Sequence, residues 1–349
     1  MLFRSIRNAA AIAGACVVPM QARAHVGTRV VIIGGGYAGA TCAKYIRKWA
    51  ADIHVTLVER SHEFVSCPVS NLVIAGTRTL SSITLSYAGL EKHGVKVVQG
   101  EAVAIDPVKN TVRLASGEAL PYDRLVVAPG VDPVYDTIPG LKSADAQSRI
   151  LHAWKAGEQT VALRKQLESM RDGGVFAIHV PRAPYRCAPA PYERACQVAW
   201  YFKTAKPKSK VLVLDANEDI QSKKALFMAA WNGPYKGMVE YRPNSELTDV
   251  DVQTLTAKLE FEDVKADVLN VVPPQRAGAI AAQSGLITAN NRWCGVDWLT
   301  MESVAHKGIH VLGDATLSAP VMPKSGHMAN QHGKVCARSE EHTSELQSH

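Results

Sequence analysis

The chain has 349 residues, 47% of them hydrophobic, which is more than one domain usually holds and enough to bury a sizeable core. Basic residues outnumber acidic residues by 39 to 32, but no lysine- and arginine-rich run occurs and only 6% of residues are aromatic, so a nucleic-acid-binding protein is not favoured. The histidines lack the spacing of metal ligands, and we expect no metal site.

The N-terminus has the features of an export signal. Arg4 and Arg7 precede a short apolar stretch at 9–18, and Ala22-Arg23-Ala24 supplies an A-x-A cleavage site. The apolar stretch is too short for a stable membrane span. We therefore expect residues 1–24 to be a signal peptide, the mature chain to lie in the periplasm, and no integral membrane segment in it.

Residues 30–39 predict a strand, a tight turn and a helix. Four β-branched residues are followed by Gly34, Gly36 and Gly39 in the pattern G-x-G-x-x-G. Such glycines allow the turn, the approach of a pyrophosphate and the packing of helix on strand, while the helix N-terminus offers amides to phosphate. A second strand at 53–58 ends at Glu59, about 20 residues on, where a dinucleotide's ribose is held. The pattern predicts a dinucleotide site.

The next segments continue an α/β pattern. A loop at 64–76 leads into an apolar helix-like stretch, short strands are expected at 95–98 and 111–114, and the segment 122–130 reads as a buried strand ending in a Pro-Gly turn. The segment 153–170 reads as a helix that leads into a second unit.

That unit is a second βαβ, with strands at 174–180 and 210–215 around a helix at 191–205. The connection at 181–191 contains four prolines and no glycine. Proline has no N–H to offer a phosphate, so the unit has nucleotide-binding topology without the phosphate cradle, and we expect it not to bind a nicotinamide cofactor.

The remainder contains a helix near 223–231, a strand at 266–272 and a last strand at 308–314 that ends at Asp314. Residues 338–349 resemble the translation of a sequencing-library adapter, so we exclude them from the fold and expect a natural C-terminal domain to be missing.

The glycine turn, the segment 122–130 and Gly313-Asp314 together resemble the FAD-dependent pyridine-nucleotide-disulfide reductase superfamily. In detail the chain is similar to the flavin subunit of flavocytochrome c sulfide dehydrogenase over about 29–335. Four motifs carry this resemblance, namely Ser66-Cys67-Pro68-Val69-Ser70-Asn71, the run from Tyr185-Arg186-Cys187 to Tyr192-Glu193-Arg194, Pro273-Pro-Gln-Arg-Ala-Gly278 and Met322-Pro-Lys-Ser-Gly326.

The resemblance implies two Rossmann-like, three-layer, doubly wound α/β domains. The FAD domain, 25–150 and 266–337, is discontinuous, and the second domain, 151–265, is inserted in it. It also implies an FAD site formed by Gly34, Gly36, Tyr37, Ala38, Gly39, Glu59, Arg60, Cys67, Asn71, Val103, Ala128, Pro129, Gly130, Gly313, Asp314, Lys324 and Ser325, with FAD attached covalently through Cys67.

By the same resemblance, Cys187 is one of two redox-active cysteines, and its partner lies in a C-terminal region of the family. Hydrosulfide would attack the disulfide to give a persulfide, the released thiolate would pass two electrons to the flavin, and a separate c-type cytochrome subunit would receive them. The helix start that follows Cys187 leads us to expect a lowered thiol pKa.

Several alternatives remain open. Glu193 is either a general base for sulfide or a first-turn acid on a helix dipole, and Lys324 either stabilises reduced flavin or is a surface lysine. Cys196 is a conceivable substitute partner, although we expect Cys42, Cys196, Cys294 and Cys336 to be structural. Two other functions are a sulfide:quinone reductase and a redox-inert flavin-binding subunit.

Overall fold

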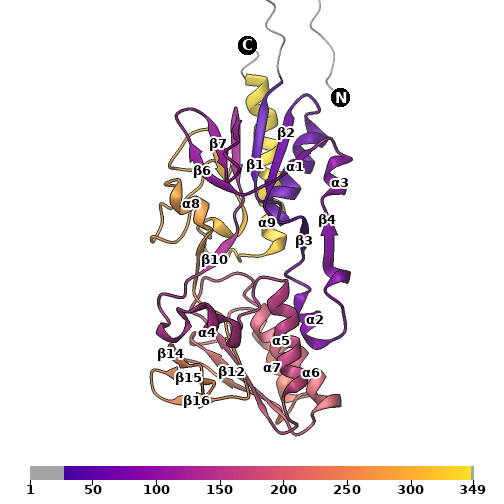
Figure 1. The fold of residues 1–349 in the computed structure, drawn as a ribbon, viewed down its shortest axis with the longest axis vertical. Helices are drawn as coiled ribbons and strands as arrows, with labels where there is room; N and C mark the ends of the chain where they lie inside the picture. The colour runs from indigo at the N-terminus through magenta and orange to yellow at the C-terminus, as the bar shows by residue number, and fades with distance from the viewer. Residues whose placement is uncertain (1–26, 347–349) are drawn as a thin grey trace, which may run out of the picture.

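The computed structural model describes residues 27–346, with side chains through residue 339, so the expected signal peptide lies outside the described part. Two lobes lie one above the other along the long axis (Figure 1). In the upper lobe five parallel strands form a sheet in the order β19-β9-β1-β2-β5. These strands are β1 (Arg29–Ile33), β2 (His54–Glu59), β5 (Lys96–Gln99), β9 (Arg124–Val127) and β19 (Ile309–Val311). Because β19 comes from the C-terminal part, the upper lobe is built from two separated stretches of chain.

Two helices pack against each other over this sheet, α1 (Tyr37–Trp49) and α9 (Gly326–Leu346) (Figure 1). Ala38, Cys42, Ile46 and Trp49 share one face of α1, and the first three are buried. Trp49 is 40% exposed. The reason is its position at the last residue of α1, where its ring packs on Tyr45 at the surface. α9 extends into the stretch 338–349 that the sequence analysis excludes from the fold.

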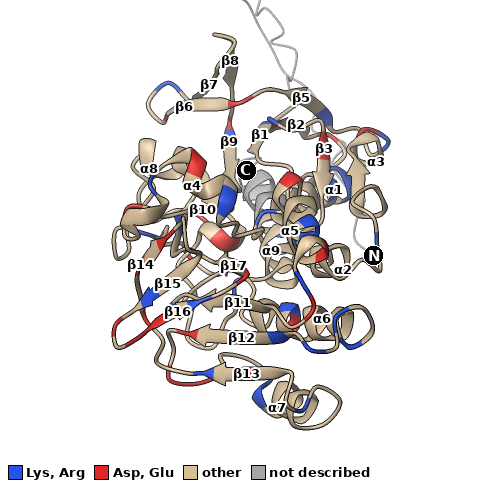
Figure 2. Ribbon diagram, turned by 60° about the horizontal axis from the view of Figure 1, so that its bottom comes forward, with Lys and Arg blue, Asp and Glu red and all other residues tan. Residues whose placement is uncertain are grey.

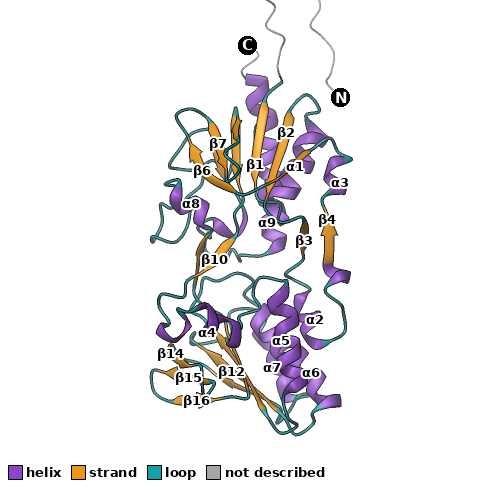
Figure 3. Ribbon diagram, viewed as in Figure 1, coloured by secondary structure: helices purple, strands orange, loops and turns teal. Residues whose placement is uncertain are grey.

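Shorter elements complete the upper lobe (Figure 3). An antiparallel meander of three strands shares the core of the large sheet, and a hairpin and a ribbon lie nearer the lower lobe. These elements are β6 (Ala102–Asp106), β7 (Thr111–Leu114) and β8 (Ala119–Pro121) in the meander, β3 (Glu63–Val65) and β4 (Thr84–Ser86) in the hairpin, β10 (Val131–Pro133) and β18 (Gln275–Ala277) in the ribbon, and the helices α3 (Ala88–Glu91) and α8 (Ala279–Gln283). The helix α2 (Ser70–Ala75) lies at the lower lobe, and its Ile74 belongs to the core of that lobe (Figure 3).

The lower lobe has its own parallel sheet, in the order β13-β12-β11-β17. Its strands are β11 (Val175–Val180), β12 (Lys210–Asp215), β13 (Val239–Arg242) and β17 (Val268–Val271). Helices α5 (Glu158–Ser169), α6 (Ala190–Ala205) and α7 (Lys224–Asn232) share one core with it. A second core joins it to α4 (Ala144–Arg149) and to the antiparallel strands β14 (Leu247–Asp251), β15 (Thr256–Leu259) and β16 (Asp263–Lys265).

The structure therefore confirms two Rossmann-type α/β units. One helix begins later than predicted, because α5 starts at Glu158 rather than near Ala153. The residues before it form a loop in which Ala153 has a positive φ, and His152 and Ala153 give their carbonyls to Arg194 instead of a helix ladder.

Two further observations concern the surface. Basic and acidic residues are interspersed over both lobes (Figure 2). Among residues 27–346, no helix combines the length and the apolar character needed to cross a membrane.

Candidate functional site

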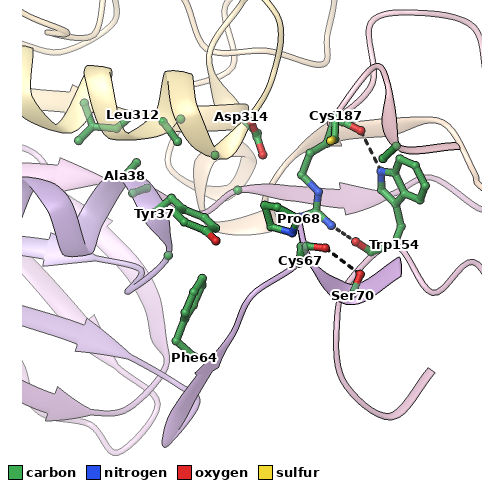
Figure 4. Close-up of a pocket in the computed structure, with 18 of the residues that line it drawn as sticks. Tyr37, Ala38, Phe64, Cys67, Pro68, Ser70, Trp154, Cys187, Leu312 and Asp314 are labelled. Carbon is green, nitrogen blue, oxygen red and sulfur yellow. Dashed lines mark hydrogen bonds between the residues drawn. The ribbon is translucent and has the colours of Figure 1, made fainter. Parts of the chain in front are cut away.

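An open cavity, about 850 Å³ with the solvent space at its mouth included, is lined by residues of both lobes. The glycine turn and the end of β19 line it from the upper lobe, while α2 and the loop before α6 line it from the other side (Figure 4). The sequence-predicted residues that line it are Gly36, Tyr37, Ala38, Cys67, Asn71, Ala128, Gly130, Cys187, Gly313 and Asp314.

The glycine turn has the geometry that a dinucleotide requires. Gly34 has φ +97°, and a Cβ there would lie 2.3 Å from the carbonyl oxygen of Ala128. A Cβ at Gly39 would lie 1.9 Å from the carbonyl oxygen of Gly34. At Gly36 a Cβ would meet nothing within 4 Å, so this position faces open space at the N-terminus of α1. The turn thus offers backbone N–H groups and a positive helix end to an anion.

The predicted adenosine-side residues lie outside the cavity lining. The carboxylate of Glu59 accepts hydrogen bonds from the backbone N–H of Gly35 (2.7 Å) and of Ser61 (2.9 Å), which fixes it beside the glycine turn. Arg60 pairs with Glu101 at 3.6 Å, and Val103 lies two residues beyond in β6 with 37% of its surface exposed. Glu59 is thus fixed beside the glycine turn, outside the cavity lining.

Cys67 precedes α2 and lines the cavity. Its sulfur accepts a hydrogen bond from the backbone N–H of Ala156 (3.4 Å), and its carbonyl accepts one from the hydroxyl of Ser70 (2.7 Å). Pro68 and Phe64 lie beside it in the wall (Figure 4). A half-buried thiol is thus held at the cavity by contacts on both sides.

Cys187 approaches the cavity from the proline-rich loop of the lower lobe. It has φ +61°, and its backbone N–H donates to the carbonyl of Lys324 (2.6 Å). Burial raises the pKa of its thiol to about 11, the Glu193 carboxylate adds to this rise, and the Arg186 guanidinium opposes it. The expectation of a lowered pKa is therefore wrong, because desolvation of the thiolate outweighs any benefit from the helix start that follows.

Glu193 does not line the cavity itself. Its carboxylate accepts a hydrogen bond from the side-chain amide of Asn71 (3.1 Å), which also donates to the carbonyl of Ala190 (3.2 Å). Burial raises the pKa of Glu193, while the Asn71 hydrogen bond and Arg194 oppose the rise. Asn71 therefore stands between this carboxylate and the cavity.

Gly313 and Asp314 end β19 at the cavity wall. Gly313 has φ +71°, and the Oδ1 atom of Asp314 is buried without a hydrogen-bond partner among the described residues. Burial raises the pKa of Asp314, and Arg186 and Lys324 oppose that rise. Nearby, Pro129 packs against Gly278, so only its neighbours Ala128 and Gly130 reach the cavity.

Lys324 and Ser325 do not line the cavity, but they hold the segments around it in place. The Lys324 ammonium donates to the carbonyls of Asp314 (3.0 Å) and Thr316 and lies 3.7 Å from the ring centroid of Trp293. Burial lowers its pKa to about 8. Ser325 accepts a hydrogen bond from the backbone N–H of Met328 (3.2 Å) at the start of α9. Lys324 is buried, so it is not a surface lysine.

Half of the lining residues were not predicted as functional, among them Trp154, Arg186 and Arg194. The indole N–H of Trp154 donates to the carbonyl of Arg186 (3.1 Å), and the Arg186 guanidinium donates to the carbonyl of Trp154 (Figure 4). Arg186 and Arg194 flank Cys187 and Glu193 in the motifs quoted above, a signal that points to them. Trp154 falls in a stretch predicted as helix and carries no such signal.

The described residues fit an FAD cofactor. The open space at Gly36 suits a pyrophosphate, and the unpartnered Oδ1 of Asp314 suits the hydroxyls of a ribityl chain. The cavity size and its aromatic and apolar lining suit a ring system. Among residues 27–339, no three His, Cys, Asp or Glu side chains are grouped as metal ligands.

Comparison with known proteins agrees with this geometry. Residues 28–168 match the pyridine nucleotide-disulphide oxidoreductase family, and residues 160–273 match the central part of the sulfide dehydrogenase (flavocytochrome c) flavoprotein chain. Among curated proteins, a sulfide dehydrogenase flavoprotein chain from Chlorobaculum thiosulfatiphilum is 58% identical over 45 residues, which is 94% of that sequence and 13% of this chain.

Longer matches are more distant. The mitochondrial sulfide:quinone oxidoreductase of Mus musculus is 26% identical over 322 residues, which is 87% of this chain and 69% of the mouse protein. The structure of the sulfide:quinone oxidoreductase of Aquifex aeolicus shares the fold, with a TM-score of 0.79 and 20% identity over 91% of this chain and 77% of that one. The chain thus belongs to the FAD-binding pyridine nucleotide-disulphide oxidoreductases, and within them to the sulfide-oxidising flavoproteins that include the flavoprotein chain of flavocytochrome c sulfide dehydrogenase.

Proposed function

We propose that this protein is a periplasmic FAD enzyme that oxidises sulfide and passes the electrons to a separate c-type cytochrome. The observation that carries the proposal is the convergence of Cys67 and Cys187, from two separated segments, on one cavity that begins at a dinucleotide turn. The match of the central region to a flavocytochrome c flavoprotein chain supports the cytochrome as acceptor. The A-x-A site at 22–24 supports export.

The residues of the upper lobe would bind and orient the cofactor. The amides of the turn at Gly36 and Tyr37 hold the pyrophosphate, Glu59 holds the ribose, and Asp314 accepts from the ribityl hydroxyls. Cys67 is the covalent attachment point, because its thiol is at the cavity and only half buried. When bound, FAD accepts an electron pair and releases single electrons.

The residues of the lower lobe would handle sulfide. Cys187 forms a disulfide with a cysteine of the C-terminal region that the resembled family carries. Hydrosulfide attacks this disulfide, so that one S–S bond forms as another breaks, leaving a persulfide and a thiolate. Glu193, whose pKa is raised by burial and whose carboxylate is held by the Asn71 amide, is the candidate base for the proton of incoming sulfide.

Two measurements test the reaction. Anaerobic addition of sulfide should bleach the flavin absorbance of the protein expressed with its natural C-terminal region, and Cys187→Ser in that protein should abolish the bleaching. Cys196→Ser is the matched control, because Cys196 lies nine residues on and accepts a hydrogen bond from the Trp231 indole (3.3 Å) instead of lining the cavity. Unchanged flavin absorbance in the parent protein would favour a redox-inert flavin-binding subunit.

A second candidate is a sulfide:quinone reductase, because the longest matches are to enzymes of that name. The reduced protein should transfer electrons to added cytochrome c faster than to a water-soluble quinone. The reverse order would replace the cytochrome proposal.

The covalent bond has its own test. After acid precipitation, yellow colour should stay with the pellet of the parent protein and of Cys187→Ala, and should move to the supernatant in Cys67→Ala. Free flavin from the parent protein would exclude the covalent link while leaving the oxidoreductase proposal intact.

A further inference from the structure

Arg194 is a deeply buried arginine in the wall of the cavity. It lies on α6, next to Glu193, and only 1% of its surface is exposed. It lines the same cavity as Cys67 and Cys187. A buried guanidinium costs free energy unless its N–H groups are hydrogen-bonded and its positive charge is compensated.

Its hydrogen-bond acceptors among the described residues are all neutral. Two are side-chain amides, Asn71 Oδ1 at 3.0 Å and Asn270 Oδ1 at 2.9 Å. Two are backbone carbonyls, of His152 at 2.8 Å and Ala153 at 2.7 Å. The guanidinium carbon also lies 5.0 Å from the ring centroid of Trp154. The geometry of the guanidinium is thus fixed, but its charge is not cancelled by a directly bonded carboxylate.

The charge persists at neutral pH and interacts with the sulfur sites. Burial lowers the pKa of Arg194 to about 9, while Glu193, Cys187 and Cys67 oppose this fall. In a space of low dielectric, a cation without a bound anion attracts an anion that forms nearby more strongly than it would in water. Cys187 is the cavity cysteine that becomes anionic during the proposed thiol–disulfide exchange.

We propose that Arg194 is a positioning residue whose buried charge stabilises the Cys187 sulfur as a thiolate. This inference rests on the redox role proposed for Cys187. Asn71 joins this charge to Glu193, since it accepts from Arg194 and donates to the Glu193 carboxylate. One amide therefore holds the cation and the carboxylate in fixed positions around the thiol.

Other charged groups also act on Cys187. Glu193 and Asp314 favour the neutral thiol, and Arg186 favours the thiolate. Arg186 donates to the carbonyl of Trp154, which directly follows the two residues whose carbonyls accept from Arg194, whereas the side chain of Asn270 accepts from Arg194. A variant that cancels the charge of Arg194 alone can therefore separate the two arginines.

Asn270→Asp is that variant. Asn270 does not line the cavity, and an aspartate there keeps the oxygen that accepts from Arg194 and pairs the guanidinium with a negative charge. The change also removes the amide that donates to the carbonyls of Leu151 (2.5 Å) and His152 (3.0 Å), so a thermal melt first establishes that the variant is folded. In the purified, flavin-containing protein reduced with a phosphine, the rate of Cys187 alkylation by iodoacetamide is followed against pH by peptide mass spectrometry. The pH midpoint of Cys187 alkylation should rise by about one unit in Asn270→Asp and by at least as much in Arg194→Met. In Arg194→Lys the midpoint should return much of the way to that of the parent protein.

Arg164→Met is the matched control. Arg164 donates to the carbonyls of Ile74 (3.3 Å) and Ala75 (3.0 Å) and lies 4.1 Å from the Tyr201 ring centroid, so it also ties segments together, but it does not line the cavity. The Arg164→Met variant should have a lower melting temperature and an unchanged pH midpoint of Cys187 alkylation.

An unchanged midpoint in folded Asn270→Asp, or an equal shift in Arg164→Met, would overturn the proposal. If Arg194→Met does not fold, Asn270→Asp decides alone. The assay uses no sulfide and no electron acceptor, so a failure of the proposed reaction leaves its result readable.

Discussion

The backbone N–H of Cys187 donates a 2.6 Å hydrogen bond to the carbonyl of Lys324. This bond joins the loop that follows β11 of the lower lobe to the segment that precedes α9 of the upper lobe. The Lys324 side chain then binds the carbonyl of Asp314, at the end of β19. The candidate redox cysteine is therefore held by the same segment that positions the cofactor-binding aspartate, which couples the two halves of the site.

The glycines of the turn give a paired prediction. Gly36→Val should cost less than about 1 kcal/mol of unfolding free energy, because a Cβ there meets nothing within 4 Å, but it should weaken FAD binding at least ten-fold (roughly 1.4 kcal/mol) by filling the phosphate position. Gly39→Ala should cost about 1–3 kcal/mol or more, because its Cβ would lie 1.9 Å from the Gly34 carbonyl oxygen. Thermal melts and flavin content of the purified variants measure both effects. Equal flavin content in parent and Gly36→Val would contradict the placement of the pyrophosphate.

Asp314 should show a conflict between stability and binding. Its Oδ1 is buried without a partner and burial raises its pKa, so Asp314→Leu should leave the flavin-free chain at least as stable as the parent chain. The same change removes the acceptor for the cofactor, so FAD binding should be lost. Denaturant unfolding of the flavin-free protein and FAD titration check the two parts. Normal FAD affinity in this variant would show that Asp314 does not contact the cofactor.

The lower lobe should not bind NADH despite its Rossmann-type sheet. Asp215 ends the second strand, where a nucleotide-binding unit places its ribose acid, but it is fully buried and accepts hydrogen bonds from Tyr192 (2.6 Å) and Tyr241 (3.1 Å). The connection before α6 contains prolines instead of glycines. Calorimetric titration with NADH should detect no binding to the holoprotein, and NADH should not bleach its flavin. Saturable binding would require this part of the site to be reinterpreted.

Stability should fall in mildly acidic solution because of buried histidine. Burial lowers the pKa of His179 to about 4, below the unfolded value near 6.5, so the unfolded chain binds the extra proton first as the pH falls. The contribution of neutral, buried His179 to the free energy of unfolding is fully present above about pH 6.5 and is lost as the pH falls towards 4. About 2 kcal/mol of it is lost at pH 5.

Urea unfolding at pH 8 and pH 5 tests this, and His179→Leu should reduce the difference between the two pH values. His152 and His332 have pKa values lowered to about 4 for the same reason, so part of the difference should remain. A difference that is identical in parent and variant would assign the acid sensitivity to other groups.

Local sequence patterns determined much of the fold. The glycine turn, α1 and the strand Lys210–Asp215 were predictable because a turn needs glycine at particular backbone angles and a buried strand needs consecutive apolar residues. The quoted motifs also placed Cys67, Cys187, Asn71 and Asp314 in one site, and the structure brings all four to one cavity.

Tertiary structure alone decided how the site is framed and charged. The segment before Glu158 reads as helix, but the carbonyls of His152 and Ala153 instead bind Arg194, and Trp154 thereby reaches the cavity. The thiol of Cys187 has a raised rather than a lowered pKa, because the burial that desolvates it comes from residues distant in the chain. Short-range patterns report backbone geometry and the spacing of apolar residues, whereas burial and charge at a site depend on which distant segments meet there.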